Sequence, residues 1–205
     1  MIVPAPRLFT ADDFVVTRPP GRFGRLVLKL ARRPQPDRRM WVSDPTGAPI
    51  AEVVPVTNPL RKALDGYTRH DVVDPSHGRL LALRQLPRTM RVADAHGDEL
   101  GVAHHDRREG PTLRSTCYGE GPKGHLPPVI GRLTPVRFGR YELVYGVIEV
   151  FAADGTAVAR VTNTDGQRNV VALEPGIDRP LRLLTIAVAC SLVQPVWLHP
   201  PKVRR

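Results

Sequence analysis

The chain has few cysteines, few aromatic residues and no hydrophobic run long enough to cross a membrane. Its 205 residues include two cysteines, Cys117 and Cys190, too few for a disulfide framework or a cysteine-rich metal site. Aromatic residues make up 5% of the sequence, which provides little for stacking the bases of single-stranded nucleic acid. The longest apolar stretch, Leu181 to Val193, is shorter than the roughly 17–25 residues of a transmembrane helix. We therefore expect reduced thiols and no transmembrane segment.

Catalytic and cofactor motifs are also missing. The sequence has no G-x-S-x-G, Walker A or H-E-x-x-H string. Gly119 to Gly124 fits G-x-G-x-x-G, but His-Leu-Pro-Pro follows where a dinucleotide site requires a helix. His104 and His105 are adjacent, so in a strand they point to opposite faces and do not share a metal ion. We expect no catalytic residues, no cofactor and no metal; the remaining enzyme hypothesis is a hydrolase built from scattered residues.

The length and the two termini predict one intracellular domain. A chain of 205 residues suits a single domain, although two small ones would also fit the length. The start, MIVPAPRLFTADDF, lacks the basic segment and apolar core of a secretory signal, so we expect a cytoplasmic location. The expected division is an N-terminal lead over residues 1–13, one domain over 14–198 and a basic tail over 199–205.

Glycine and proline are abundant, and strand patterns recur between them. The 17 glycines and 22 prolines indicate many turns, and no long helical pattern precedes residue 179. Arg25 to Ala31 alternates in the manner of a strand with one buried face. Asn58 to Gly66 predicts a short connecting helix. The other strand candidates are Phe14–Thr17, His70–Val73, Arg79–Leu83, Thr112–Cys117, Val129–Leu133, Tyr141–Tyr145 and Asn169–Leu173.

One sequence pattern occurs three times, in Met40–Val53, Met90–Ala103 and Val150–Val161. Each copy has an Asp at or just before a Gly, then an aliphatic residue three positions later, followed by Ala or Gly. Asp and Gly favour tight turns, so each copy predicts a β-hairpin, with the small residue where the returning strand packs closely. Three related hairpins at intervals of roughly 50 residues indicate a repetitive antiparallel sheet.

The apolar stretch near the C-terminus predicts a buried helix. Its apolar residues surround the helical wheel, with Leu181, Leu184, Ile186, Val188 and Leu192 as the proposed core. Asp178 is the expected N-cap and Pro180 suits the first turn. A sheet of about twelve to fourteen strands avoids exposed edges by closing, and this helix would fill the interior. We therefore predict an all-β fold, a closed antiparallel barrel of about 12 strands around a hydrophobic C-terminal helix.

The strand pairs VSDPTGAPIAEV and VFAADGTAVARV, followed by NVVALEPGIDRPLRLLTIAVACSLVQPVW, resemble the Tubby C-terminal-like superfamily of LURP-one-related proteins and phospholipid scramblases. The resemblance extends over nearly the whole chain, in pattern more than in identity. It implies the same barrel around a central helix, and it implies contact with membrane phosphoinositides, as in Tubby-like members. The cysteine-rich cluster and acidic calcium loop of scramblases are missing, so lipid scrambling is not expected.

Positive charge is the strongest functional signal. Thirty Lys and Arg against 20 Asp and Glu give a net charge of +10, which favours a polyanionic partner. The candidate contacts to an anion or lipid are Arg32, Arg33, Arg38, Arg39, Arg132, Arg137 and Arg140. A basic surface that reflects composition alone remains the alternative reading of these clusters.

The sequence therefore predicts a non-catalytic module that binds anionic phospholipid head groups, peripherally, at the cytoplasmic face of a membrane. A soluble protein-interaction scaffold is the alternative, because its marker, an exposed apolar patch, is not visible in a sequence. Nucleic acid ranks lower, since few aromatic residues accompany the arginines.

Overall fold

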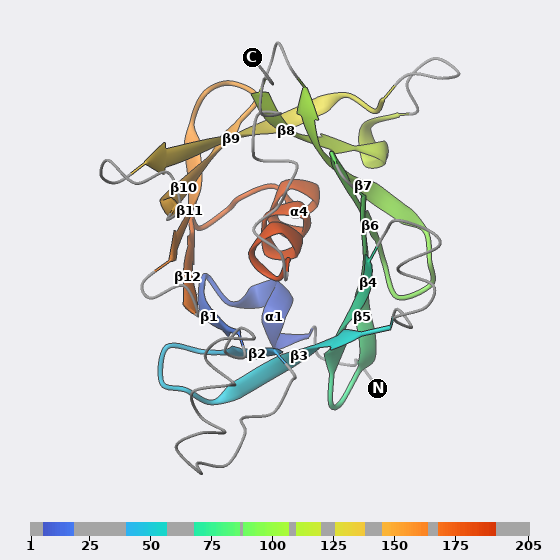
Figure 1. Cartoon of the computed structure of the whole chain (residues 1–205), viewed down its shortest axis with the longest axis vertical. Helices are drawn as coiled ribbons and strands as arrows, with labels where there is room; N and C mark the ends of the chain where they lie inside the picture. Colours follow the sequence, from blue (N-terminus) through green and yellow to red (C-terminus); the bar gives the residue numbers. More distant parts are fainter. Residues whose placement is uncertain are drawn as a thin grey trace, which may run out of the picture.

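Twelve strands close into an antiparallel barrel around one helix (Figure 1). The computed structural model describes residues 6–18, 40–56, 68–86, 88–106, 110–119, 126–137, 145–163 and 168–191. Consecutive strands pair with each other, and β1 pairs with β12 to complete the ring. The predicted fold class is confirmed. The strands are β1 (Asp13–Thr17), β2 (Met40–Ser43), β3 (Pro49–Pro55), β4 (Thr68–Asp74), β5 (Gly78–Gln85), β6 (Thr89–Ala93), β7 (Glu99–Asp106), β8 (Gly110–Ser115), β9 (Val129–Arg137), β10 (Tyr145–Ala152), β11 (Ala157–Asn163) and β12 (Arg168–Leu173).

The central helix is α4 (Arg179–Ala189). Leu181, Leu184, Ile186 and Val188 are each less than 6% exposed, which confirms them as core residues. Leu192 lies outside the described residues. Around the helix, every strand contributes its inward-facing residues, such as Phe14 and Val16 of β1 and Val42 of β2. The barrel interior is therefore a packed hydrophobic core.

Side-chain hydrogen bonds anchor α4 at both of its ends. At its C-terminal end, Asn169 donates to the carbonyl of Ala189 at 3.1 Å, and Arg18 donates to the carbonyl of Ser191 at 2.8 Å. At its N-terminal end, Arg182 donates to Asp12 at 2.7 Å. The two bonds at the C-terminal end matter because the last carbonyls of a helix have no partner within the helix itself.

The N-cap of α4 is Asp178, as predicted. Asp178 precedes the helix, but its side chain makes no capping hydrogen bond. Its carboxylate instead accepts a hydrogen bond of 2.5 Å from the phenol of Tyr118, in the 3-10 helix η1 (Thr116–Tyr118). The predicted N-cap position is therefore confirmed, but the Asp178 carboxylate links η1 to the start of α4 instead of capping a backbone N–H group. The pKa of Tyr118 is raised, chiefly by this hydrogen bond.

The three predicted hairpins are confirmed as the pairs β2–β3, β6–β7 and β10–β11. In each turn the Asp carboxylate accepts backbone N–H groups, for example those of His96, Gly97 and Asp98 on Asp94. These bonds outweigh partial burial and lower the pKa of Asp94. Asp74 forms a fourth turn of this kind between β4 and β5, which the repeat had not included.

The small residue in the second hairpin is required by close packing. A Cβ atom added at Gly101 would lie 2.2 Å from the backbone oxygen of Arg114 on β8. Gly131 of β9 is similarly tight, because its added Cβ would lie 2.7 Å from Cδ1 of Leu181. At both positions, glycine therefore allows a close approach that a larger residue would prevent: of β7 to β8 at Gly101, and of β9 to α4 at Gly131.

Several smaller predictions need adjustment. The strand expected through Cys117 ends at Ser115, because residues 116–118 turn into η1. The strand expected to end at Leu133 continues to Arg137. The predicted strand over residues 25–31, the predicted helix over 58–66 and most of the glycine motif over 119–124 lie outside the described residues.

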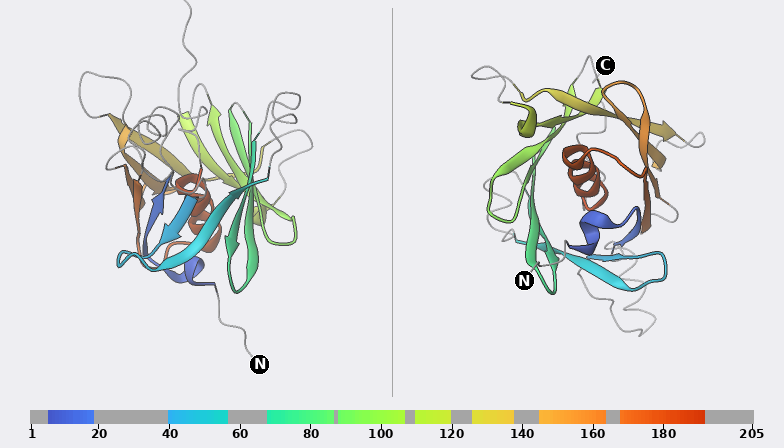
Figure 2. Two further views of the ribbon diagram at one scale, coloured as in Figure 1. Left: turned by 60° about the horizontal axis from the view of Figure 1, so that its bottom comes forward. Right: turned by 180° about the vertical axis from the view of Figure 1, so that it is seen from behind.

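The antiparallel order gives the barrel two different ends. The turns at Asp44, Asp74, Asp94 and Asp154 lie at one end, where α4 also begins; we call it the hairpin end. The last residues of α4 lie at the opposite end, beside Arg18 and Asn169, which we call the helix-exit end. Figure 2 shows α4 inside the barrel and α1 (Arg7–Thr10) at the hairpin end. Leu8 of α1 is fully buried in the core. The division into a lead, a domain and a tail stays a prediction.

Candidate anion-binding surface

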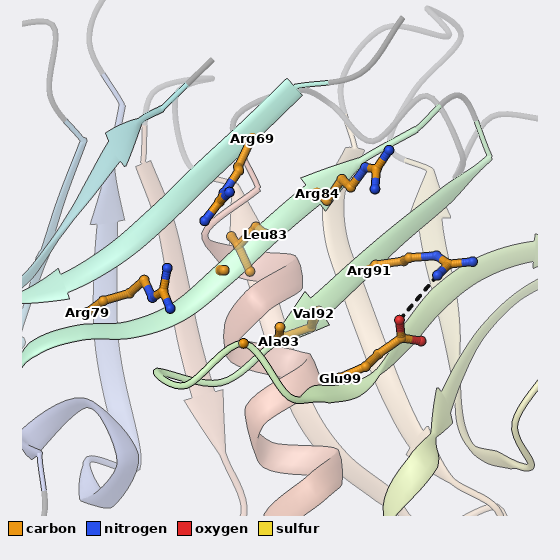
Figure 3. A pocket seen from close by; sticks show the side chains of 10 residues that line it. Arg69, Arg79, Leu83, Arg84, Arg91, Val92, Ala93 and Glu99 are labelled. Carbon is orange, nitrogen blue, oxygen red and sulfur yellow. Dashed lines mark hydrogen bonds and ion pairs between the residues drawn. The ribbon is translucent and has the colours of Figure 1, made fainter. Parts of the chain in front are cut away.

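A groove of about 380 Å³ runs over the outer wall of the barrel, across β4 to β7 (Figure 3). Four arginines and one glutamate give it a positive character. The lining residues are Arg69, Arg79, Ala82, Leu83, Arg84, Arg91, Val92, Ala93, Gly97 and Glu99. None of the four arginines was among the contacts predicted from the sequence.

Three of these arginines form a row across adjacent strands. Arg69 of β4 lies directly opposite Arg84 of β5, and Arg84 lies directly opposite Arg91 of β6. Directly opposed residues on one face have Cβ atoms about 4.5–5.5 Å apart, and like charges at such positions destabilise a sheet. We call Arg69, Arg84 and Arg91 the arginine row.

The floor beside the row is made of short side chains. Ala82 of β5 and Ala93 of β6 are also directly opposite each other, two residues along from Arg84 and Arg91. Alanine leaves a depression where longer side chains would fill the wall. On the side of the groove away from the arginine row, Arg79 donates two hydrogen bonds, of 2.6 and 3.2 Å, to the carbonyl of Ala95 in the β6–β7 turn. In Figure 3 the guanidinium groups of Arg69 and Arg79 turn toward each other over β5.

Two carboxylates lie near the row and neutralise part of its charge. Glu99 of β7 pairs with Arg91 at 3.3 Å, with side chains 37% and 56% exposed respectively. Asp71 lies 3.6 Å from Nε of Arg69. Exposed pairs of this kind contribute about 0–1 kcal/mol and weaken in salt. The groove lining therefore keeps a net positive charge, since Glu99 is its single carboxylate.

The groove has the chemistry of a binding site. Its lining includes no serine, threonine, cysteine or histidine that would act as a nucleophile or base. Within the described ranges, no group of three or more His, Cys, Asp and Glu residues is placed to hold a metal ion. Arginine presents a planar fork of N–H donors that matches the oxygens of phosphate and carboxylate. The arrangement therefore suits an anion with several oxygen atoms.

The arginines predicted as contacts are placed as follows. Arg132 is exposed on β9, opposite Thr112 of β8 and Phe151 of β10, three strands from β6 and thus outside the groove. Arg137 is the last residue of β9. Arg32, Arg33, Arg38, Arg39 and Arg140 lie outside the described residues. Of the two described residues, neither Arg132 nor Arg137 lines the groove, and the role of all seven arginines stays a prediction.

The fold and the groove define a closed twelve-strand β-barrel with a central helix and a basic outer wall. No family model and no curated protein matches the chain. Among solved structures, the protein AT5G01750 of Arabidopsis thaliana is similar, with a TM-score of 0.53, 12% identity, and coverage of 86% of this chain and 88% of that one. At this identity the likeness shows the fold alone. None of the helices in the described parts of the chain is long and apolar enough to cross a membrane.

Proposed function

We propose that the protein is a non-catalytic module that binds anionic phospholipid head groups at the surface of a membrane. The observation that carries this proposal is the arginine row. Three arginines at directly opposed positions on adjacent strands repel one another, and a bound phosphate would relieve that repulsion. The resemblance of the sequence to Tubby-like and LURP-one-related proteins supports the same ligand class.

Two other partners fit the described surface less well. Single-stranded nucleic acid needs exposed aromatic residues beside the cations, but among the described residues the two large exposed aromatics, Trp41 and Tyr118, lie on β2 and η1, outside the groove. A protein scaffold would present a contiguous apolar patch. The exposed large apolar residues of the described ranges are distributed over several elements instead: Trp41, Val56, Tyr118, Leu126 and Val170.

The proposal is tested by co-sedimentation with vesicles. Neutral vesicles of phosphatidylcholine are compared with mixed vesicles that also contain phosphatidylserine, at low and at raised salt. We expect binding only to the mixed vesicles, and a loss of binding in salt, because screening shortens the reach of the charges. No binding to the mixed vesicles at low salt would refute the proposal.

The row is tested by the variant in which Arg69, Arg84 and Arg91 are all changed to Gln. Each basic residue near an anionic surface contributes about 1 kcal/mol, so the triple variant should bind roughly 100-fold more weakly. Its stability without lipid should be retained or increased, because the like-charge row is gone. Thermal unfolding measures the stability without lipid. If the row had only a structural role, the triple variant would be less stable than the natural protein.

A matched control removes the same charge elsewhere. Arg7, Arg160 and Arg179 are all exposed and lie outside the groove, on α1, β11 and the start of α4. Changing all three to Gln should weaken binding far less than changing the row. Equal losses in the two triple variants would mean that net charge alone drives binding, and the groove would then not be the site.

A further inference from the structure

The charged residues of the described ranges are separated along the barrel axis. At the helix-exit end, basic residues lie at or next to the ends of three described strands: Arg69 is the second residue of β4, Arg84 the penultimate residue of β5 and Arg168 the first residue of β12. Arg88 lies in the connection between β5 and β6 at the same end. Arg137 ends β9 and Asp106 ends β7 at this end, and two further carboxylates lie close to its residues: Asp71 is 3.6 Å from Nε of Arg69, and Glu52 of β3 is directly opposite Trp41 of β2. Among the described residues, the helix-exit end therefore carries more arginines than carboxylates.

The hairpin end is predominantly acidic. The carboxylates there lie in the hairpin turns, at strand ends and before α4: Asp12, Asp13, Asp44, Asp74, Asp94, Asp98, Glu99, Asp154, Glu174 and Asp178. The cations at this end are Arg7, Arg79, Arg114, Arg179 and Arg182. Two of them are neutralised by partners, since Arg7 pairs with Asp44 at 3.0 Å and Arg182 with Asp12 at 2.7 Å. An anionic surface would attract one end of the barrel and repel the other.

Two exposed apolar side chains also lie at the basic end. Trp41, the second residue of β2, is 39% exposed and lies opposite Thr17, the last residue of β1. Val56 follows β3, is 47% exposed and donates its N–H to the carbonyl of Arg69. Tryptophan has an apolar ring and a polar N–H, so it suits a boundary that is apolar on one side and wet on the other. Trp41 is directly opposite Thr17 of β1 and Glu52 of β3, and Arg168 of β12 is opposite Thr17 on its other side. A tryptophan and an arginine two strands apart at one end match the head-group layer of a bilayer.

We infer that the barrel docks end-on, with its helix-exit end against the anionic bilayer and its hairpin end turned away. This inference rests on the proposed function and specifies how the protein would lie on the lipid. The contacts are Arg69, Arg84, Arg88 and Arg168, with Trp41 entering the head-group layer. They come from β4, β5, the β5–β6 connection, β12 and β2. The contact therefore extends beyond the groove, to the strands on the other side of β3.

The orientation is tested with single-tryptophan variants. The chain has two tryptophans, so Trp197→Phe leaves Trp41 as the reporter. The opposite reporter is Tyr118→Trp, made together with Trp41→Phe and Trp197→Phe. It suits the purpose because Tyr118 is 56% exposed at the hairpin end, where it contacts Asp178. Both proteins are mixed with phosphatidylcholine–phosphatidylserine vesicles that carry brominated acyl chains, and bound protein is measured by co-sedimentation of the same samples.

The expected result is that Trp41 emission shifts to the blue and is quenched by the bromine atoms, whereas the Tyr118→Trp reporter stays unchanged. Binding without a response of Trp41, or an equal response of both reporters, would overturn the end-on orientation while the proposed function stands. Absence of the protein from the pellet would instead refute the proposed function, and the inference with it. Circular dichroism of each variant confirms that it is folded.

A pair of single variants tests the orientation without a fluorophore. Arg168 on β12 lies outside the groove, yet end-on docking places it against the lipid. Arg168→Gln should weaken vesicle binding by about fivefold, the factor that corresponds to roughly 1 kcal/mol at an anionic surface. Arg160→Gln is the matched control, since Arg160 is exposed midway along the neighbouring strand β11. Equal effects of the two variants would contradict end-on docking.

Discussion

Gly131 of β9 lies where the barrel wall touches the central helix, and its replacement by Ala tests that packing directly. The added Cβ would lie 2.7 Å from Cδ1 of Leu181 and 2.9 Å from the backbone oxygen of Phe151. Both distances are too short, so β9 or the Leu181 side chain has to move. Overpacking of this kind costs about 1–3 kcal/mol. In a domain of this size 1 kcal/mol lowers Tm by about 2–4 °C.

The double variant with Leu181→Ala shows whether the Leu181 side chain is the obstacle. Leu181→Ala alone leaves a cavity and should cost about 2–5 kcal/mol. In the double variant the new Cβ at position 131 occupies part of that cavity, and the contact with Phe151 remains. The combined loss should therefore be smaller than the sum of the two single losses by about 0.5–3 kcal/mol, as for residues in contact.

The assay is urea unfolding of the four proteins, followed by far-UV circular dichroism. The control cycle pairs Gly131→Ala with Leu173→Ala on β12, a buried leucine three strands away. We expect the control pair to be additive within about 0.5 kcal/mol. If the losses of the Gly131 and Leu181 variants were additive, the close contact between β9 and the Leu181 side chain of α4 would be refuted.

Three further predictions concern the core, the thiols and the hairpin turns. Ile186→Asp places an unpaired charge in the fully buried helix and should abolish cooperative folding, so a normal unfolding transition would contradict the central-helix structure. A thiol reagent should label only the exposed Cys117 in the native protein and Cys190 only after unfolding, because burial raises the pKa of Cys190 to about 12. Asp94 has a lowered pKa in the fold, so its ionisation stabilises the protein above the unfolded pKa of about 3.9, and this stabilisation is lost as the pH falls through the lower folded pKa. The stability advantage of the natural protein over Asp94→Asn, measured by urea unfolding, should accordingly shrink below about pH 4, and a constant advantage would count against this role.

The arginine row could not be predicted from the spacing of arginines along the chain. Its members are spread over more than twenty residues, and none is next to another in the chain. They meet because the Asp74–Gly78 turn and the β-bulge next to it set the register of β4 against β5, while the short connection between β5 and β6 sets the register of that pair. Counting outward from the first turn would have placed Arg69 opposite Leu83, but the β-bulge between Val72 and Val73 shifts the register by one residue and brings Arg84 to that position. The contacts predicted from the sequence were arginines that lie close together along the chain, such as Arg32 and Arg33.

The sequence by itself determined the architecture. Alternating strands, Asp and Gly turns and one helix apolar on every side leave few ways to bury the apolar surface, and a barrel closed around that helix is one that leaves no strand edge. What the tertiary structure alone decided is the placement of charge. Strand register and the alternation of connections determine which arginines are opposed and which end of the barrel is basic. The physical reason is that apolar periodicity is local along the chain, whereas electrostatic neighbours are made by pairing between strands.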